Sequence, residues 1–345
     1  MSHYDDVVFV IFKEIFITFL TMRFVHDNFE YIQQDPGIEG MKKIIELAAR
    51  TCYKTEDLIK DGTADKIINN VLIPRGHTSC LEFGTVYLYR EMNMFEGQTW
   101  INKYLYDRYS RVKVSPIENT HKKGVWITTT FRTILQGEYK NPIDAIKNNF
   151  DKDWTEDLQW WSEPTEHHYK RICYRFVMDR VGSQSVMRHR GRFGISYGQE
   201  STRFINYHRD KFDNNITYVY PSKFYQLIDE WSESQDSLTG EKYDWLKKSS
   251  DEEKLNFLRC HDRGWCAYED SLKKAEQEYM YLTGEEGWRP EDARGVLPLD
   301  VKTEFLMCAY SEDWDMFFFR RCDKHAHPHI QSIAYKLYDD YLTRI

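Results

Sequence analysis

Residues 188–203 read RHRGRFGISYGQESTR, and this stretch is the most informative part of the chain. It opens with three basic or potentially basic side chains in a row, Arg188, His189 and Arg190. Neighbouring guanidinium groups repel one another unless water or an anion surrounds them, and the planar fork of arginine matches phosphate. Further along follow an amide, a carboxylate, a hydroxyl and another guanidinium: Gln199, Glu200, Ser201 and Arg203. Such a mixture can hold a phosphate and contact a polar ring, which is what a nucleotide site requires.

The basic run has a second interpretation, a solvated helix end. Cations at a helix C-terminus complement the helix dipole, and the run alone favours this interpretation. The alternating pattern of residues 169–177 predicts a strand, and Gly182 and Ser183 break it. Ser183 is the expected N-cap of a short helix that ends at the basic run. Neighbouring helical side chains project in different directions, so the run can contact different parts of one large ligand.

The composition limits the kind of protein. The 345 residues are enough for one large domain or two modest ones, and 41% hydrophobic and 16% aromatic residues support a substantial core. The formal net charge of −8 argues against a general binder of nucleic acid or membrane surfaces, so we expect neither as a partner. An anion site must therefore be a local basic pocket in an acidic protein.

The seven cysteines are scattered and form no CxxC pair. This pattern predicts a reducing compartment, and hence a cytoplasmic location, rather than a disulfide framework. None stands in a signature typical of a nucleophile, and small buried hydrophobic side chains are their expected role. They are Cys52, Cys80, Cys173, Cys260, Cys266, Cys308 and Cys322.

Residues 1–21 are expected to be an N-terminal extension, or the product of a start codon assigned too early. The apolar run from Val7 to Leu20 contains Lys13 and Glu14 and is shorter than the roughly 20 residues that span a bilayer. Acidic residues precede it, which argues against a secretory signal. The competing interpretation is an extra strand or helix on the domain.

The hydrophobic periodicity predicts helices and strands in the remainder of the chain. Helical spacing occurs in residues 40–54, 63–72, 142–150, 255–281, 311–323 and 328–342. Strands are expected at residues 83–89, 125–131 and 169–177, while residues 301–309 fit either class. We expect an α+β fold in which residues 22–345 form a single domain with an insertion at residues 91–165.

Three separated segments of the chain carry a family resemblance. They are Leu47–Tyr53 with Gly76–Glu82; Arg188–Arg190 with Ser201–Phe204; and Ala293–Pro298, Thr303–Glu304, Trp314, Phe317–Arg321 and His325–Ala326. In these segments the chain resembles the flavin-dependent thymidylate synthases, the ThyX family. The segments occur in the order of the family and extend over about residues 22–342, which makes chance agreement improbable.

The resemblance implies an activity. The family makes dTMP from dUMP, with methylenetetrahydrofolate as one-carbon donor and NADPH as reductant acting through FAD, and without an enzyme cysteine nucleophile. It also implies a mixed central β-sheet with flanking helices, and a homotetramer whose active sites lie at subunit interfaces.

By resemblance, eight residues are expected to contact FAD. They are His77, Ser79, Glu82, Arg188, His189, Arg190, Tyr310 and His325. Glu82 would accept hydrogen bonds from adenosine or orient His77, and His189 has an alternative role as a structural histidine. Tyr310 stands where the family often has a flavin-binding asparagine, and would stack or hydrogen-bond instead.

By resemblance, nine residues are expected to contact dUMP. They are Ser185, Arg188, Gln199, Glu200, Ser201, Thr202, Arg203, Arg294 and Arg321. Arg321 is the expected catalytic residue, because a guanidinium beside a uracil carbonyl stabilises negative charge while C5 acts as a carbon nucleophile. Its neighbour Arg320 is the rival, and an ordinary surface pair at a helix end is the alternative for both.

Two features keep other functions open. Ten residues, Gly191 to Glu200, separate the basic run from Ser201, where the family usually has fewer, so a non-catalytic flavin- or nucleotide-binding homologue is one alternative. The second alternative is a metal site at His325, His327 and His329, with His167 and His168 elsewhere. We expect no metal site, because i and i+2 positions do not share a helix face.

Overall fold

The computed structural model describes residues 22–136, 157–189, 194–236, 240 and 242–345. The N-terminal extension, the helix predicted at residues 142–150 and Arg190 therefore lie outside the described residues. The chain forms two compact units. The larger comprises Asp27–Ser201 and Thr303–Ile345, and the smaller comprises residues 22–26 and Thr202–Lys302. Each unit is described by itself.

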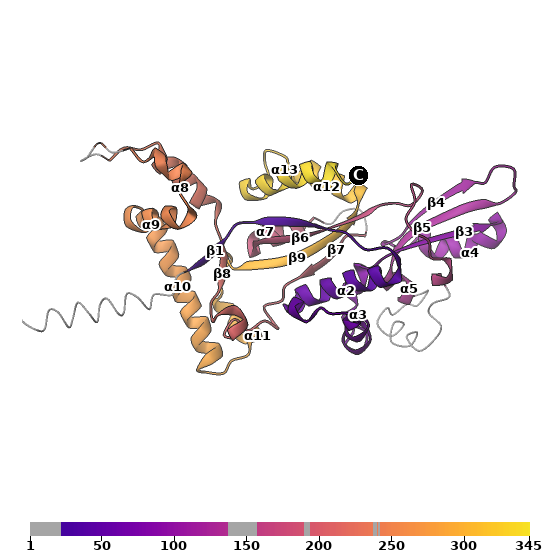
Figure 1. The fold of residues 1–345 in the computed structure, drawn as a ribbon, viewed down its shortest axis with the longest axis horizontal. Coiled ribbons are helices and arrows are strands. Elements are labelled where there is room, and N and C mark those ends of the chain that lie inside the picture. Colours follow the sequence, from indigo (N-terminus) through magenta and orange to yellow (C-terminus); the bar gives the residue numbers. More distant parts are fainter. Residues whose placement is uncertain (1–21, 137–156, 190–193, 237–239, 241) are drawn as a thin grey trace, which may run out of the picture. The chain divides into compact units, whose positions relative to one another are not determined.

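A four-stranded sheet forms the centre of the larger unit, in the order β2-β6-β9-β7 (Figure 1). Its strands are β2 (Asn28–Ile32), β6 (Arg171–Asp179), β9 (Lys302–Tyr310) and β7 (Ser196–Gln199). The β2/β6 and β7/β9 pairs are antiparallel. The alternation that predicts a strand at residues 169–177 is confirmed, and the ambiguous segment 301–309 is a strand.

Helices cover both faces of this sheet because successive side chains point to opposite sides. On one face, Ile172, Tyr174 and Phe176 pack with aromatic and aliphatic residues of α12 (Ser311–Arg321) and α13 (Pro328–Leu342). On the other face, Cys173 and Cys308 pack against α2 (Gly37–Tyr53). The expected α+β fold with helices flanking a sheet is therefore confirmed.

A second sheet in the larger unit contains β3 (Thr85–Met92), β5 (Lys123–Thr130) and β4 (Arg111–Pro116), all antiparallel. It packs with α4 (Met94–Leu105) and α5 (Phe131–Gln136) around a core of its own. Beside it lie α3 (Thr63–Ile67) and the π-helical turn Ile68–Leu72, which confirm the helix predicted at residues 63–72.

The smaller unit pairs β1 (Arg23–Val25) with β8 (Thr217–Val219) in parallel and surrounds them with helices. These are α8 (Ser222–Ser232), α9 (Asp251–His261), α10 (Arg263–Gly284) and α11 (Pro290–Ala293). The single helix predicted at residues 255–281 is wrong, because Asp262 interrupts it. The Asp262 carboxylate accepts the backbone N–H of Trp265 at 2.7 Å and so caps a new helix. Within the described ranges, no helix has the length and apolar character needed to cross a bilayer.

Candidate active site

The basic run stands at the end of α7 (Arg180–Met187), where Arg188 is the C-cap. The predicted position of this run is confirmed, but the predicted N-cap is wrong. Asp179, the last residue of β6, caps the helix by accepting the backbone N–H of Gly182. Ser183 lies one turn further on, and its hydroxyl donates to the carbonyl of Arg180 at 2.9 Å.

The end of α12 approaches the end of α7. The apolar face of α12, with Trp314, Phe317 and Phe318, is buried against the sheet, so its last turn is held in place. Arg321 in that turn donates from Nη2 to the backbone carbonyl of Ser185 at 2.7 Å. Two residues that the sequence assigns to the same nucleotide therefore meet, although 136 positions separate them.

Three guanidinium groups gather here, and we refer to Arg188, Arg320 and Arg321 as the arginine cluster. Burial lowers the pKa of Arg321, Tyr197 opposes this shift, and the charges of Arg320 and Arg188 lower the pKa further. Arg188 and Arg320 are exposed, while Arg321 is half-buried with an Nε–H that has no partner in the described part of the chain. No carboxylate among the described residues forms an ion pair with the cluster. Such uncompensated charge favours an anionic ligand.

His189 points away from solvent. Its ring is 1% exposed and meets the ring of Phe317 edge-on, with centroids 5.6 Å apart. Burial lowers its pKa to about 4, assisted by the charges of Arg321 and Arg320, although the nearby Asp313 backbone opposes the shift. Neither ring nitrogen makes a hydrogen bond of normal geometry within the described ranges. The imidazole is therefore neutral near pH 7, and this placement favours its structural role.

Tyr197 of β7 fixes the backbone that carries these groups. Its hydroxyl donates to the carbonyl of His189 at 2.8 Å, and the carbonyl of Val186 lies at 3.3 Å. The sequence analysis did not identify Tyr197 as a site residue. The period-two pattern of residues 196–199 is the one signal for it, and three glycines in the surrounding loop obscure that pattern.

The polar residues after the basic run also contact α7. The side-chain amide of Gln199 donates to the hydroxyls of Ser183 at 2.8 Å and of Thr303 at 3.1 Å. Glu200 is buried, and its backbone N–H donates to the carbonyl of Glu304. Ser201 donates its backbone N–H to the carbonyl of Cys52. Gln199 and Arg321 therefore both contact helix α7.

Three further residues with a predicted dUMP contact belong to the smaller unit: Thr202, Arg203 and Arg294. Arg203 is exposed and forms an ion pair with Glu291, with Nε and Oε2 2.7 Å apart. Arg294 begins a short 3-10 turn and is exposed.

The predicted FAD contacts His77, Ser79 and Glu82 differ in how exposed they are to a ligand. Ser79 is exposed, and His77 is half-buried with its Nδ1 against the hydroxyl of Tyr53. Glu82 is buried in an ion pair with Arg132, so its carboxylate is directed into the protein rather than toward His77.

Tyr310 lies in the interior with no exposed surface. Its hydroxyl donates to the carbonyls of Tyr109 at 2.7 Å and Thr128 at 2.9 Å, and the Arg111 guanidinium lies 4.3 Å from the centre of its ring. These contacts satisfy the side chain within the protein. They favour a structural role over the predicted flavin contact.

The C-terminal histidines have separate roles. His325 is exposed and shares a 2.8 Å hydrogen bond with Asp323, and His327 caps α13. His329 is buried between Asp179 and Asp27, with each nitrogen–oxygen distance 3.1 Å. Burial opposes the charged form of His329, but the two neighbouring carboxylates raise its pKa to about 9. In the described part of the chain, no three histidine, cysteine or acidic side chains are placed to hold a metal ion.

The fold and the site together define an α+β protein with an arginine cluster where two helices end. The chain belongs to the thymidylate synthase complementing protein family, whose model matches residues 159–343, more than half of the sequence. Solved structures to which the chain is similar include the UMP/dUMP methylase PolB from Streptomyces cacaoi bound with 5-Br dUMP, and the same protein bound with 5-Br UMP. Both are 12% identical and cover 94% of this chain and 93% or 92% of theirs, with TM-scores of 0.38 and 0.37. No curated protein matches the chain.

Proposed function

We propose that this protein is a flavin-dependent thymidylate synthase that methylates dUMP to dTMP. The observation that carries the proposal is the arginine cluster, in which Arg321 reaches the end of α7 and no carboxylate of the described residues neutralises the charge. Membership of the thymidylate synthase complementing protein family supplies the reaction class.

The roles follow from the chemistry of each group. Arg188 is exposed at the helix end, where its fork can bind phosphate. Arg321 is held at a fixed place by Ser185, so its guanidinium can stabilise negative charge on the uracil carbonyl at low reorganisation cost. The C5–H bond of uracil is replaced by a bond to the one-carbon unit, and the proton leaves to solvent.

FAD, NADPH and methylenetetrahydrofolate belong to this proposal. The Nε–H of Arg321 is an orphaned polar group that fits the proximity of a large polar cofactor. Among the predicted FAD contacts that the structure describes, Arg188, Ser79, His77 and His325 have surface left to hold it. When bound, FAD supplies the reducing equivalents that NADPH provides. A homotetramer with shared sites and a cytoplasmic location complete the proposal.

Release of tritium from 5-tritiated dUMP tests the function. Protein supplied with FAD, NADPH and methylenetetrahydrofolate should release tritium and form dTMP, and omission of any one should stop dTMP formation. Absence of both products from protein that binds FAD would refute the synthase and leave a non-catalytic flavin-binding homologue. The ten residues between the basic run and Ser201 favour that second candidate.

A further inference from the structure

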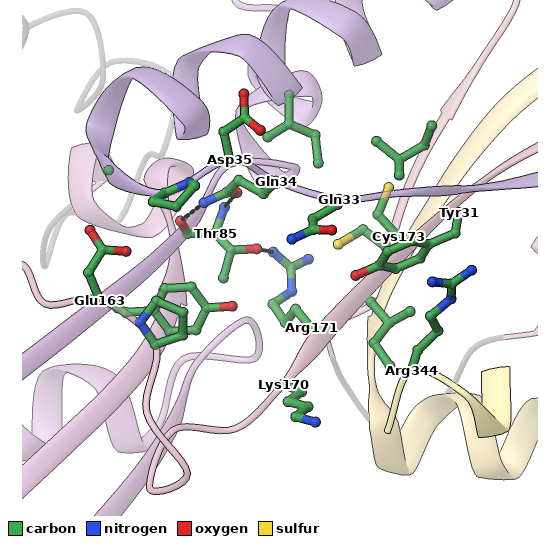
Figure 2. A pocket seen from close by; sticks show the side chains of 18 of the residues that line it. Tyr31, Gln33, Gln34, Asp35, Thr85, Glu163, Lys170, Arg171, Cys173 and Arg344 are labelled. Carbon is green, nitrogen blue, oxygen red and sulfur yellow. Dashed lines mark hydrogen bonds between the residues drawn. The ribbon is translucent and has the colours of Figure 1, made fainter.

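A cavity of about 270 Å³ lies in the larger unit, lined by residues of β2, β6, β9 and the start of α2. Figure 2 shows Arg171 and Cys173 of β6 among its lining residues, with Thr85 beside Arg171. None of the residues that line it belongs to the arginine cluster. The cavity is several times the roughly 30 Å³ that one water occupies in the liquid, so a molecule of a few heavy atoms fits.

Two thiols line this cavity, Cys173 on β6 and Cys308 on β9. The two strands are neighbours in the sheet, and both side chains belong to one packed cluster on the face toward α2. Neighbouring strands lie about 4.8 Å apart, which is compatible with the Cα separations of roughly 4.4–6.8 Å that a disulfide spans. Both thiols are buried.

Arg171 places a cation beside the thiols. It precedes Cys173 by two residues, so both side chains lie on the same face of β6. Its guanidinium donates to the carbonyl of Glu82 and the hydroxyl of Ser196, both at 2.9 Å. Its buried Nε–H has no partner, and no carboxylate pairs with it, in the part of the chain that the structure describes. A buried cation without a carboxylate favours a nearby thiolate.

We propose that Cys308 is a peroxide-reactive thiolate and that Cys173 resolves its oxidised form to a disulfide. The Cys308 thiolate attacks hydrogen peroxide; an S–O bond forms, the O–O bond breaks and hydroxide leaves. Cys308 is thereby oxidised to a sulfenic acid and the peroxide is reduced. The Cys173 thiol then attacks that sulfur; an S–S bond forms, the S–O bond breaks, and the hydroxyl leaves with the Cys173 proton as water.

The electrostatics of the pair agree with this order of events. The neighbouring Cys173 thiol lowers the pKa of Cys308 to about 7; burial opposes the shift, while Arg171 and Thr85 assist it. Burial raises the pKa of Cys173, and its contact with Cys308 raises it further. The other charged residues that line the cavity, Asp35, Glu163, Lys170 and Arg344, are exposed and so are screened by solvent.

A second thiol pair provides a matched comparison. Cys80 lies beside Cys52, and this contact together with burial raises the pKa of Cys80 well above its ordinary value. The neighbouring carboxylate of Glu82 also raises the pKa of Cys80. This pair therefore lies beside an anion, whereas Cys308 lies beside the cation of Arg171. We therefore expect slow oxidation of Cys80 under conditions that oxidise Cys308.

Oxidation of the reduced full-length protein tests the proposal. A few equivalents of hydrogen peroxide at pH 7, an alkylating quench and peptide mass mapping should yield a Cys173–Cys308 disulfide at least tenfold faster than any change at Cys80. In Cys173→Ser, dimedone should trap a sulfenic acid on Cys308. The Cys260→Ser variant, which removes an exposed thiol, should leave both results unchanged.

The wild-type protein and Cys260→Ser are sufficient for the test, so neither Cys173 nor Cys308 of the buried pair needs to be replaced. Oxidation of Cys80 or Cys260 while Cys308 stays reduced would overturn the proposal. The inference is independent of the proposed synthase function, because its readout is the mass of the cysteine peptides rather than dTMP.

Discussion

The guanidinium of Arg321 donates a 2.7 Å hydrogen bond to the backbone carbonyl of Ser185. This bond joins the last turn of α12 to α7 at Ser185, three residues before Arg188 at the end of that helix. The bond occupies Nη2 of Arg321 and leaves the buried Nε–H without a partner in the described part of the chain. Arg321 is therefore oriented by the protein and still has a donor for a ligand.

Replacement of Arg321 by alanine should lower kcat for dTMP formation about 100- to 1,000-fold, because removal of one preorganised donor to a developing anion costs this much. Bound FAD should remain, as judged by the visible spectrum. Arg320→Ala is the matched control: its side chain is exposed and makes no described bond to α7, so it should lose less than tenfold. If Arg320→Ala lost more activity than Arg321→Ala, Arg320 would be the residue that contacts the uracil.

Tyr197→Phe removes the hydroxyl that holds the carbonyl of His189. One hydrogen bond of this kind contributes about 1 kcal/mol, so the KM for dUMP should rise about three- to tenfold while kcat stays within a factor of two. Steady-state kinetics at varied dUMP separate the two constants. A fall in kcat alone would mean that Tyr197 contacts the reacting atoms instead of positioning the basic run.

Tyr310→Phe distinguishes a structural from a flavin-binding role. The hydroxyl donates to two backbone carbonyls in the interior, so its loss should lower the free energy of unfolding by about 1–3 kcal/mol. The amount of FAD bound per chain should not change, and chemical denaturation with the flavin spectrum measures both. Loss of flavin from a variant of normal stability would restore the contact expected from the family resemblance.

His329 should make the stability depend on pH in the alkaline range. Its folded pKa of about 9 exceeds the unfolded value, so its contribution is complete below about pH 6.5 and disappears as the pH rises through 9. The full contribution is about 3 kcal/mol. The difference in unfolding free energy between wild type and His329→Gln should shrink from pH 6.5 to pH 10. A constant difference would show that the histidine is not charged.

Glu276 in the smaller unit should also make the stability fall as the pH rises, in a lower pH range than His329. Burial raises its pKa to about 6, although the N–H of Ile216 and the hydroxyl of Tyr218 donate to its carboxylate. Its contribution is complete below about pH 4.5 and is lost as the pH rises through 6. Glu276→Gln should therefore stabilise the protein at pH 8 by about 1–2 kcal/mol, measured as a higher Tm, and have little effect at pH 4.5. Destabilisation at pH 8 would mean that the ionised carboxylate is the favoured form.

The parts of the fold that local pattern determines could be predicted from the sequence. The alternation around Tyr174 identified both β6 and the residues on each of its faces, because strand side chains have a period of two. The break at Asp262 was missed because the apolar spacing continues from α9 into α10. The cap at Ser183 was misassigned because a serine and an aspartate four residues apart are both good caps.

The site could be predicted only in part for a different reason. The residue types of the arginine cluster are visible in the sequence, but the contact between Arg321 and Ser185 depends on how α12 packs on the sheet. The burial of Tyr310 and Glu82 likewise depends on neighbours far along the chain. A family resemblance assigns roles to residues by their type. It does not show whether a side chain is exposed enough to reach a ligand.

Equilibrium binding of dUMP and of deoxyuridine, which lacks the phosphate, tests the role of the arginine cluster most directly. The wild-type protein should bind dUMP at least 100-fold more tightly than deoxyuridine, and this preference should weaken with added salt. In the double variant Arg188→Ala with Arg321→Ala, the preference should fall to less than tenfold. Equal affinity of the wild type for both compounds, or an unchanged preference in the double variant, would contradict the account.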